Sequence, residues 1–184
     1  MDRQAFITST LCLTLTQTTM ISNEIYKMLN AQINAEMWAA YLYLSMSLHA
    51  ELNGYRGVAN WFFCQSREEL DHSRILQRYV MAQERPVKLM PICGVQSEWS
   101  SPLEMFRMAL THEKAVTSMI NDIMINAETE RDYATTSRMT WFVDEQVEEE
   151  ENCTELVQKF EKASDAPCYY MQIDYELQKR KYEP

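Results

Sequence analysis

Four stretches of the sequence carry an apolar stripe with alternating three- and four-residue spacing, and one glutamate interrupts each stripe near its middle. The interrupting acids are Glu36, Glu69, Glu113 and Glu149. This spacing places a stripe on the face of a helix that packs against other helices. A carboxylate on such a face is costly unless a positive charge meets it. One such acid could belong to a buried ion pair, but four that face one another need cations. The pattern therefore predicts a helical bundle with a carboxylate-lined centre for two metal ions.

Length and composition fit a helical chain. The 184 residues suffice for one domain with a continuous core. Only three glycines and five prolines are present, which favours an all-α fold. The 27 acidic residues outnumber the 17 basic ones, so the formal net charge is −10. We expect no nucleic-acid partner, because such binding depends on basic patches. Taken alone, the acidity is more typical of a solvated surface than of a binding site.

The cysteines and the N-terminal segment indicate the cellular compartment in which the protein is expected. Five cysteines form no CxxC pair, and their odd number favours reduced thiols and a cytoplasmic protein. No stretch approaches the roughly 20 apolar residues of a membrane helix, so no membrane partner is expected. Residues 1–19 hold six threonines and a single basic residue, Arg3. We expect this segment to be a disordered extension or absent from the mature protein, with one domain over residues 20–184.

Start and stop signals divide that domain into five helices. The expected helices cover about 22–52, 56–84, 101–126 and 133–162, with a shorter fifth from about 164 to 179. Residues 86–100 contain two prolines and a glycine and show no helical period, which indicates an extended crossover. Two helical hairpins joined by one long connection form an antiparallel four-helix bundle. The fold class is therefore all-α, a bundle with one crossover and a short C-terminal helix.

The four acids are expected at one depth in this bundle. Glu36 lies 18 residues before Gly54, and Glu69 lies 15 residues after it. Glu113 and Glu149 each lie 18 residues from Arg131, in the second turn. At about 1.5 Å per residue, all four acids stand about 22–27 Å from their turns. They therefore meet in the middle of the bundle.

The second stripe adds a nitrogen ligand. His72 follows Glu69 by three residues, so both side chains share the inward face and can bind one metal ion. Four carboxylates match the charge of two divalent cations, and oxygen ligands with one nitrogen suit iron or manganese. The corresponding place on the fourth stripe reads Gln146-Val147-Glu148-Glu149 and offers no histidine. The second metal ion is therefore expected to be bound more weakly, as suits a metal that leaves after oxidation.

These residues and their surroundings resemble the bacterial non-haem ferritins. The resemblance covers about residues 20–183 and includes His112-Glu113, the run from Trp141 to Glu149, and the final helix around Tyr169–Asp174. It implies a ferritin-like bundle that assembles into a homo-oligomeric cage of 24 subunits. Such a cage oxidises Fe(II) with O2 at a ferroxidase centre and stores Fe(III) mineral. Leu70 stands where haem-containing relatives have a methionine, so the resemblance implies no haem.

The resemblance also assigns roles to single residues. It implies a first iron position formed by Glu36, Glu69 and His72. It implies a second formed by Glu69, Glu113 and Glu149, with Gln146 close by. A tyrosine beside the centre that can donate an electron corresponds to Tyr43. The residues that resemble a third iron position, on the path to the cavity, are Glu68, Glu145 and Glu148.

Two other classes of function remain as alternatives. A carboxylate-bridged di-iron oxidoreductase would act on an organic or peroxide substrate, but the missing second Glu-x-x-His motif speaks against it. A non-catalytic cage subunit would lack a working centre, whereas this sequence contains every expected ligand. The leading interpretation is an iron-storage protein with ferroxidase activity.

Overall fold

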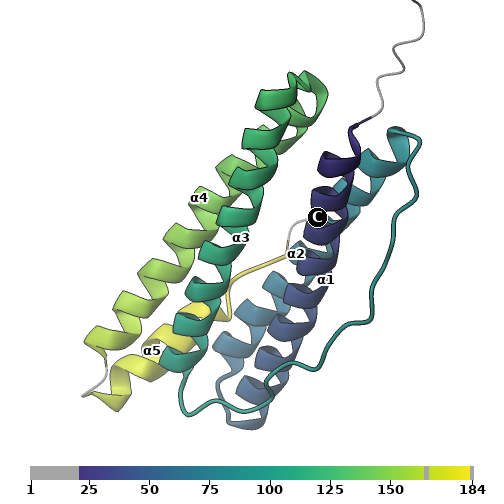
Figure 1. Ribbon diagram of the computed structural model, residues 1–184. Coiled ribbons are helices and arrows are strands. Elements are labelled where there is room, and N and C mark those ends of the chain that lie inside the picture. Colours follow the sequence, from purple (N-terminus) through teal and green to yellow (C-terminus); the bar gives the residue numbers. More distant parts are fainter. Residues whose placement is uncertain (1–20, 164–165, 183–184) are drawn as a thin grey trace, which may run out of the picture.

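The computed structural model describes residues 21–163 and 166–182, which form five helices and no strands. The helices are α1 (Asn23–Leu52), α2 (Arg56–Ala82), α3 (Pro102–Glu130), α4 (Tyr133–Lys162) and α5 (Pro167–Leu177). The α1–α2 and α3–α4 hairpins stand side by side, and α5 crosses one end of the bundle (Figure 1). The predicted fold class is confirmed. The expected N-terminal extension, residues 1–19, lies outside the described residues.

Side-chain caps define where three of the long helices begin. The Ser22 hydroxyl accepts a hydrogen bond from the backbone N–H of Ile25, at 3.1 Å. Ser101 caps α3 in the same way, with proline at the first helical position, and Asp132 caps α4. Each cap satisfies a backbone N–H that has no partner inside its helix. The predicted starts of these helices are therefore confirmed.

Two predicted helix ends were wrong by a few residues. Helix α2 stops at Ala82, two residues early, and Glu84 takes a left-handed backbone with φ of 57°. Helix α3 continues to Glu130, four residues beyond the expected end, and Arg131 ends it in the left-handed region with φ of 58°. Neither terminating residue is a glycine, so the sequence carried no clear stop signal at these positions.

The crossover between α2 and α3 runs along the outside of α1 (Figure 1). Polar side chains of α1 bind its extended backbone. Asn30 accepts from the N–H of Lys88 at 2.8 Å, and Asn34 accepts from that of Met90 at 2.7 Å. Farther along, the His49 ring stacks edge-on against Trp99. The predicted crossover is confirmed, and these contacts hold it against α1.

The core consists of two apolar clusters. One lies toward the α1–α2 turn, where the rings of Phe62, Phe106 and Phe160 stack in sequence. The other contains Leu29 and Leu76 and lies toward the opposite end. All five side chains are fully buried. Neither cluster contains the acids of the four stripes, so a polar layer divides the core at mid-bundle.

The short helix α5 packs against the start of α2. The Asp174 carboxylate accepts hydrogen bonds from the N–H groups of Gly57 and Val58, at 2.8 and 2.9 Å. A Cβ atom on Gly57 would lie 1.6 Å from the Asp174 carbonyl oxygen. Only glycine therefore permits this close approach.

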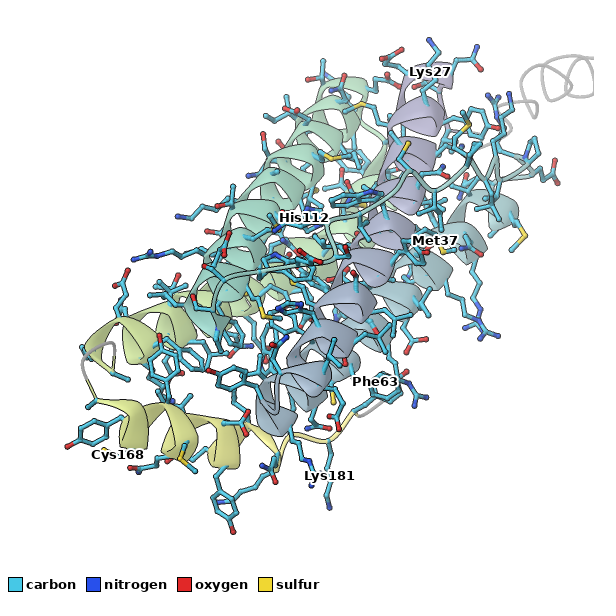
Figure 2. All side chains as sticks on the ribbon, turned by 90° about the horizontal axis from the view of Figure 1, so that it is seen from below. Lys27, Met37, Phe63, His112, Cys168 and Lys181 are labelled. Carbon is cyan, nitrogen blue, oxygen red and sulfur yellow. The ribbon has the colours of Figure 1, made fainter. Side chains whose placement is uncertain are left out.

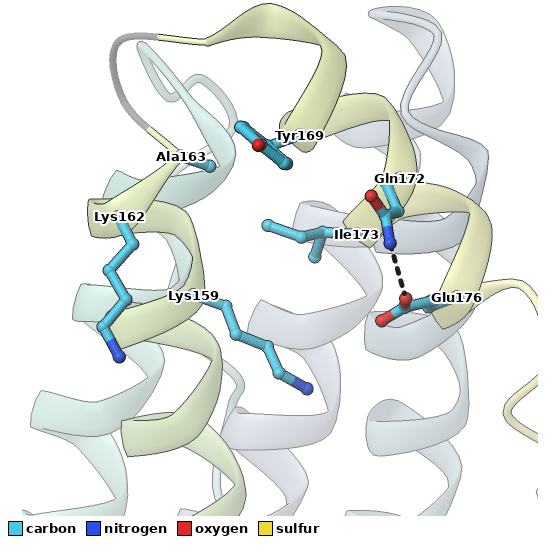
Figure 3. Close-up of a pocket in the computed structure, with 7 residues that line it drawn as sticks. All are labelled: Lys159, Lys162, Ala163, Tyr169, Gln172, Ile173 and Glu176. Carbon is cyan, nitrogen blue, oxygen red and sulfur yellow. Dashed lines mark hydrogen bonds between the residues drawn. The ribbon is translucent and has the colours of Figure 1, made fainter.

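An open cavity of about 350 Å³ separates α5 from the end of α4. Lys159, Ile173 and Glu176 are among its lining residues (Figure 3). No residue of the predicted metal centre lines it. Among the described helices, none is long and apolar enough to cross a membrane.

Candidate metal centre

Each of the four long helices contributes one buried glutamate to the polar layer. Glu36, Glu69, Glu113 and Glu149 expose 1%, 3%, 1% and 4% of their surface, respectively. His112, the neighbour of Glu113, marks this mid-bundle level in Figure 2. Burial of this degree is exceptional for glutamate. The structure thus brings together the four acids that the sequence stripes predict.

One group of side chains at this level has the geometry of a metal site. Glu36, Glu69 and His72 offer ligand atoms that all lie within 4.8 Å of one another. The His72 Nδ1 atom is 3.4 Å from a carboxylate oxygen of Glu69, as their three-residue spacing on one helix predicts. These three residues could hold one metal ion.

The opposite ring nitrogen of His72 faces a second group. Its Nε2 atom lies 3.7 Å from a carboxylate oxygen of Glu145. His72, Glu145 and Glu149 again present ligand atoms within 4.8 Å of one another. His72 therefore stands between the two groups. Each of its two ring nitrogens could bind one metal ion.

Glu113 approaches the centre from α3. Tyr43, fully buried on α1, donates a hydrogen bond to one of its carboxylate oxygens. Gln146 on α4 donates to the other at 3.3 Å. The structure thus places Tyr43 and Gln146 beside Glu113, where the resemblance puts the redox tyrosine and the extra ligand.

Two glutamines that the sequence reasoning did not assign to the site also contact it. Gln32 donates to Glu36 at 2.8 Å, and Gln65 donates to Glu149 at 2.7 Å. Both amides are fully buried. Gln32 stands four residues before Glu36, and Gln65 four before Glu69, on the same stripes. A polar amide on a core-facing stripe was the signal that could have identified them.

Two carboxylate oxygens of the centre have no partner among the residues that the structure describes. Oε2 of Glu36 and Oε2 of Glu149 are buried, and no described residue donates a hydrogen bond to either. Within residues 21–163 and 166–182, no lysine or arginine forms an ion pair with any of the four central glutamates. Buried carboxylate oxygens without a donor are strongly destabilising unless a cation or a proton meets them. The donor set therefore fits divalent metal ions.

The pKa values of the four central glutamates also reflect the cost of burying their charges. Burial, with the charge of Glu149 nearby, raises the pKa of Glu113 to about 8. Burial and the charge of Glu69 raise the pKa of Glu149 to about 8 as well. Burial also raises the pKa values of Glu36 and Glu69. The metal-free centre therefore holds protons at neutral pH, which a cation would displace.

The pKa of His72 is also raised, against the effect of burial, by its acidic neighbours. Burial opposes its charged form, but contacts with Glu145 and Glu69 outweigh burial and raise its pKa to about 12. By contrast, burial alone lowers the pKa of His112 to about 4. His112 packs against the rings of Trp38 and Tyr43 and is therefore a neutral neighbour of the centre.

The three outer acids have different environments. Glu145 reaches His72, as described above, whereas Glu148 is exposed on α4. Glu68 forms an ion pair with Arg180. The sequence reasoning missed Arg180, because nothing in the sequence places the segment after α5 beside α2.

Comparison with known proteins gives a consistent result. The family model described as "Ferritin-like domain" matches residues 26–163. The bacterial non-heme ferritin of Bacteroides fragilis (strain 638R) is 37% identical over 161 residues, which are 88% of this chain and 100% of that protein. That of Campylobacter jejuni is 37% identical over 71% of this chain and 78% of its own length. An open pore ferritin from the hyperthermophilic archaeon Archaeoglobus fulgidus superposes with a TM-score of 0.86 at 37% identity. That match covers 88% of this chain and 99% of the archaeal one.

Proposed function

The chain belongs to the ferritin family, and from this premise we propose that it stores iron by oxidising Fe(II) with O2 between its four long helices. The product would be deposited as Fe(III) mineral in the cavity of a cage. One observation carries the proposal: four buried glutamates converge with His72, and two of their oxygens have no partner within the described part of the chain. Buried acids in this state call for cations.

In this proposal each Fe(II) ion, as substrate, has its own ligands. Glu36, Glu69 and His72 would bind the first ion, because their ligand atoms already lie within 4.8 Å of one another. Glu69 would be shared with the second ion, completed by Glu113 and Glu149. Gln146 lies close enough to Glu113 to contribute or to orient it. Two divalent ions balance four carboxylates.

The chemistry follows from this ligand set. Each of the two Fe(II) ions would give one electron to O2, and together they would reduce it to the level of hydrogen peroxide, which electrons from further Fe(II) ions would reduce to water. The resulting Fe(III) prefers carboxylate and hydroxide oxygen even more strongly. Binding of the ions displaces the protons that Glu113 and Glu149 hold in the metal-free protein. Outer acids such as Glu145 and Glu148 lie along α4, and their charge would draw Fe(III) away from the centre.

The alternative functions have less support. An oxidoreductase with two permanently bound irons would benefit from a second Glu-x-x-His motif, but on α4 that position reads Gln146-Val147-Glu148-Glu149. A non-catalytic cage subunit would need no buried acids in its core. Here the acids divide the core in two, at a cost in stability that only a function of the site explains.

A homo-oligomeric cage, with 24 subunits by family resemblance, belongs to the same proposal. The outer face of α1 supports it with an apolar stripe, in which Tyr41, Leu44, Leu48 and Leu52 are 49%, 36%, 65% and 87% exposed. Large apolar side chains aligned on one exposed face are typical of an interface. We also propose the cytoplasm as the location, because Cys64, Cys93, Cys153 and Cys168 are all free.

The proposal is tested by removing two ligands of one helix together. Glu69→Ala combined with His72→Ala should abolish rapid Fe(II) oxidation, followed by absorbance after Fe(II) is mixed with aerobic buffer. Gel filtration should show the same assembly as the wild type. The control is Glu151→Ala, which removes an exposed acid from α4. Oxidation at the wild-type rate in the double variant would show that the centre lies elsewhere.

A second variant tests the other metal position. Glu149→Ala should leave the first Fe(II) ion bound but reduce the binding stoichiometry from two ions to one per subunit under anaerobic conditions. Turnover should slow accordingly. An unchanged stoichiometry of two would contradict the assignment of Glu149.

A further inference from the structure

The segment after α5 returns along α2 and inserts one arginine between its side chains. Asn60 on α2 donates to the backbone oxygens of Leu177 and Arg180, at 3.1 and 3.0 Å. The Tyr182 hydroxyl donates to Asp71, one helical turn beyond Arg67, whose guanidinium covers the Tyr182 ring. The segment is therefore attached on both sides of Arg180.

The guanidinium of Arg180 contacts three hydrogen-bond acceptors and one aromatic ring. One terminal nitrogen donates to the side-chain oxygen of Gln65 at 3.0 Å and to the Trp61 carbonyl at 3.3 Å. The other donates to the Glu68 carboxylate. The central carbon of the group lies over the Trp61 ring, 4.7 Å from its centre. An arginine held by a ring, a carboxylate and two neutral oxygens has a fixed position, unlike a mobile surface ion pair.

This position borders the metal centre. Gln65 accepts from Arg180 with its oxygen and donates to Glu149 with its nitrogen. Glu68 is adjacent in sequence to Glu69, and its charge contributes to raising the pKa of Glu149. Arg180 and Glu68 are each only 22% exposed at the side chain. A single positive charge thus stands at the outer edge of the centre, connected to it through one amide.

We infer that Arg180 replaces a third metal ion beside Glu68, and so limits each subunit to two metal ions. This inference rests on the proposed function, because it concerns the outer boundary of the same site. Glu68 would be a carboxylate ligand if it were free, but its charge is already balanced by the guanidinium. Gln65, held by Arg180 at its oxygen, keeps its N–H group directed at Glu149. Arg180 is therefore a positioning residue that sets the number of metal ions.

The test counts metal ions with a probe that is not oxidised at the centre under anaerobic conditions. Mn(II) prefers oxygen ligands as Fe(II) does, and the electron paramagnetic resonance signal of the free ion reports how much is bound. We expect two ions per subunit in the full-length wild-type protein and three in Arg180→Ala. Adding Glu68→Gln to Arg180→Ala should restore two. Arg180→Lys, which keeps the charge, should also bind two.

The matched control is Lys181→Ala. Lys181 is the next residue and is exposed, pointing away from the bundle (Figure 2). Its replacement removes the same charge without removing a contact to Glu68, so the count should stay at two. A count of three in this variant would mean that net charge alone governs binding, and would overturn the inference. Glu68→Gln by itself should also leave two ions, and loss of an ion there would contradict it too.

The outcomes separate this inference from the proposed function. If the wild type binds no Mn(II) at the centre and oxidises no Fe(II), the proposed function fails. If the wild type binds two ions and Arg180→Ala also binds two, the function stands and the role of Arg180 is wrong. A wild type that already binds three ions, with one lost in Glu68→Gln, would overturn the inference as well.

Discussion

The Tyr43 hydroxyl on α1 donates a hydrogen bond across the bundle to the Glu113 carboxylate on α3. Burial raises the pKa of Tyr43 well above its usual value, with the charge of Glu113 adding to the effect. The phenol therefore keeps its proton, and among the described residues the buried Glu113 carboxylate is the one acceptor to which it donates. A tyrosine in this arrangement loses an electron most easily when the same carboxylate takes its proton.

Replacement of Tyr43 by phenylalanine tests this coupling. In the proposed reaction, the two Fe(II) ions of the centre would supply two of the four electrons that carry O2 to water, Tyr43 would supply the third, and a further Fe(II) ion would supply the fourth. We expect Tyr43→Phe to bind two Fe(II) ions per subunit but to oxidise iron several-fold more slowly over repeated turnovers. Rapid freezing during turnover should give a tyrosyl radical signal in the wild type alone. The same signal in the variant would assign the electron to a different residue.

The metal-free protein should become less stable as the pH rises from 5 to 8. Glu113 and Glu149 have pKa values of about 8 in the folded state and ordinary values near 4.5 when unfolded. Between these limits the folded chain binds more protons, so the free energy of unfolding falls with pH, by up to about 1.4 kcal/mol per unit for each group. The pKa of His72 is raised to about 12. Above pH 6.5, where the unfolded chain loses this proton and the folded chain keeps it, His72 lowers the free energy of unfolding further. Thermal unfolding across this range measures the trend.

Metal should reverse that trend. Mn(II) competes with protons for the same oxygens, so its stabilising effect should grow as the pH rises. The metal-free double variant Glu113→Gln, Glu149→Gln has no such protons to lose, and its melting temperature should depend less on pH. If the wild type and the double variant showed equal slopes without metal, the two carboxyl groups would be ionised in the folded protein.

The sequence was sufficient to predict that the four central glutamates meet at mid-bundle, because they lie on regular helices. Helical spacing fixes the face on which Glu36 or Glu149 stands, and the distance from each turn fixes its depth. The ion pair between Glu68 and Arg180 was beyond such reasoning. Arg180 follows α5 in an irregular segment, whose path depends on contacts such as those of Asn60 that no periodicity encodes. The ends of α2 and α3 were misjudged for a similar reason, since non-glycine residues terminate them.

Gly57 is expected to be indispensable for the docking of α5. A methyl group there would overlap the Asp174 carbonyl, so Gly57→Ala should displace α5 and lose both backbone hydrogen bonds to the Asp174 carboxylate. Overpacking of this kind costs about 1–3 kcal/mol, and we expect a clearly lower melting temperature. Gly94→Ala is the control, because a methyl group at Gly94 meets nothing within 4 Å. Equal melting temperatures for the two variants would mean that α5 is not held through Gly57.

The apolar stripe on α1 should be the surface that joins subunits. Leu48 is 65% exposed near the middle of the stripe, and Leu48→Arg would place a charge where an apolar partner surface is expected. Such a charge is costly to bury without a counter-charge, so analytical ultracentrifugation should show dissociation into smaller species. Because the residue is exposed in the subunit, the helical content should not change. Ile125→Arg on α3, at 59% exposure, introduces the same charge away from the stripe. If Leu48→Arg stayed assembled while Ile125→Arg dissociated, the interface would lie on α3 and the stripe would have another purpose.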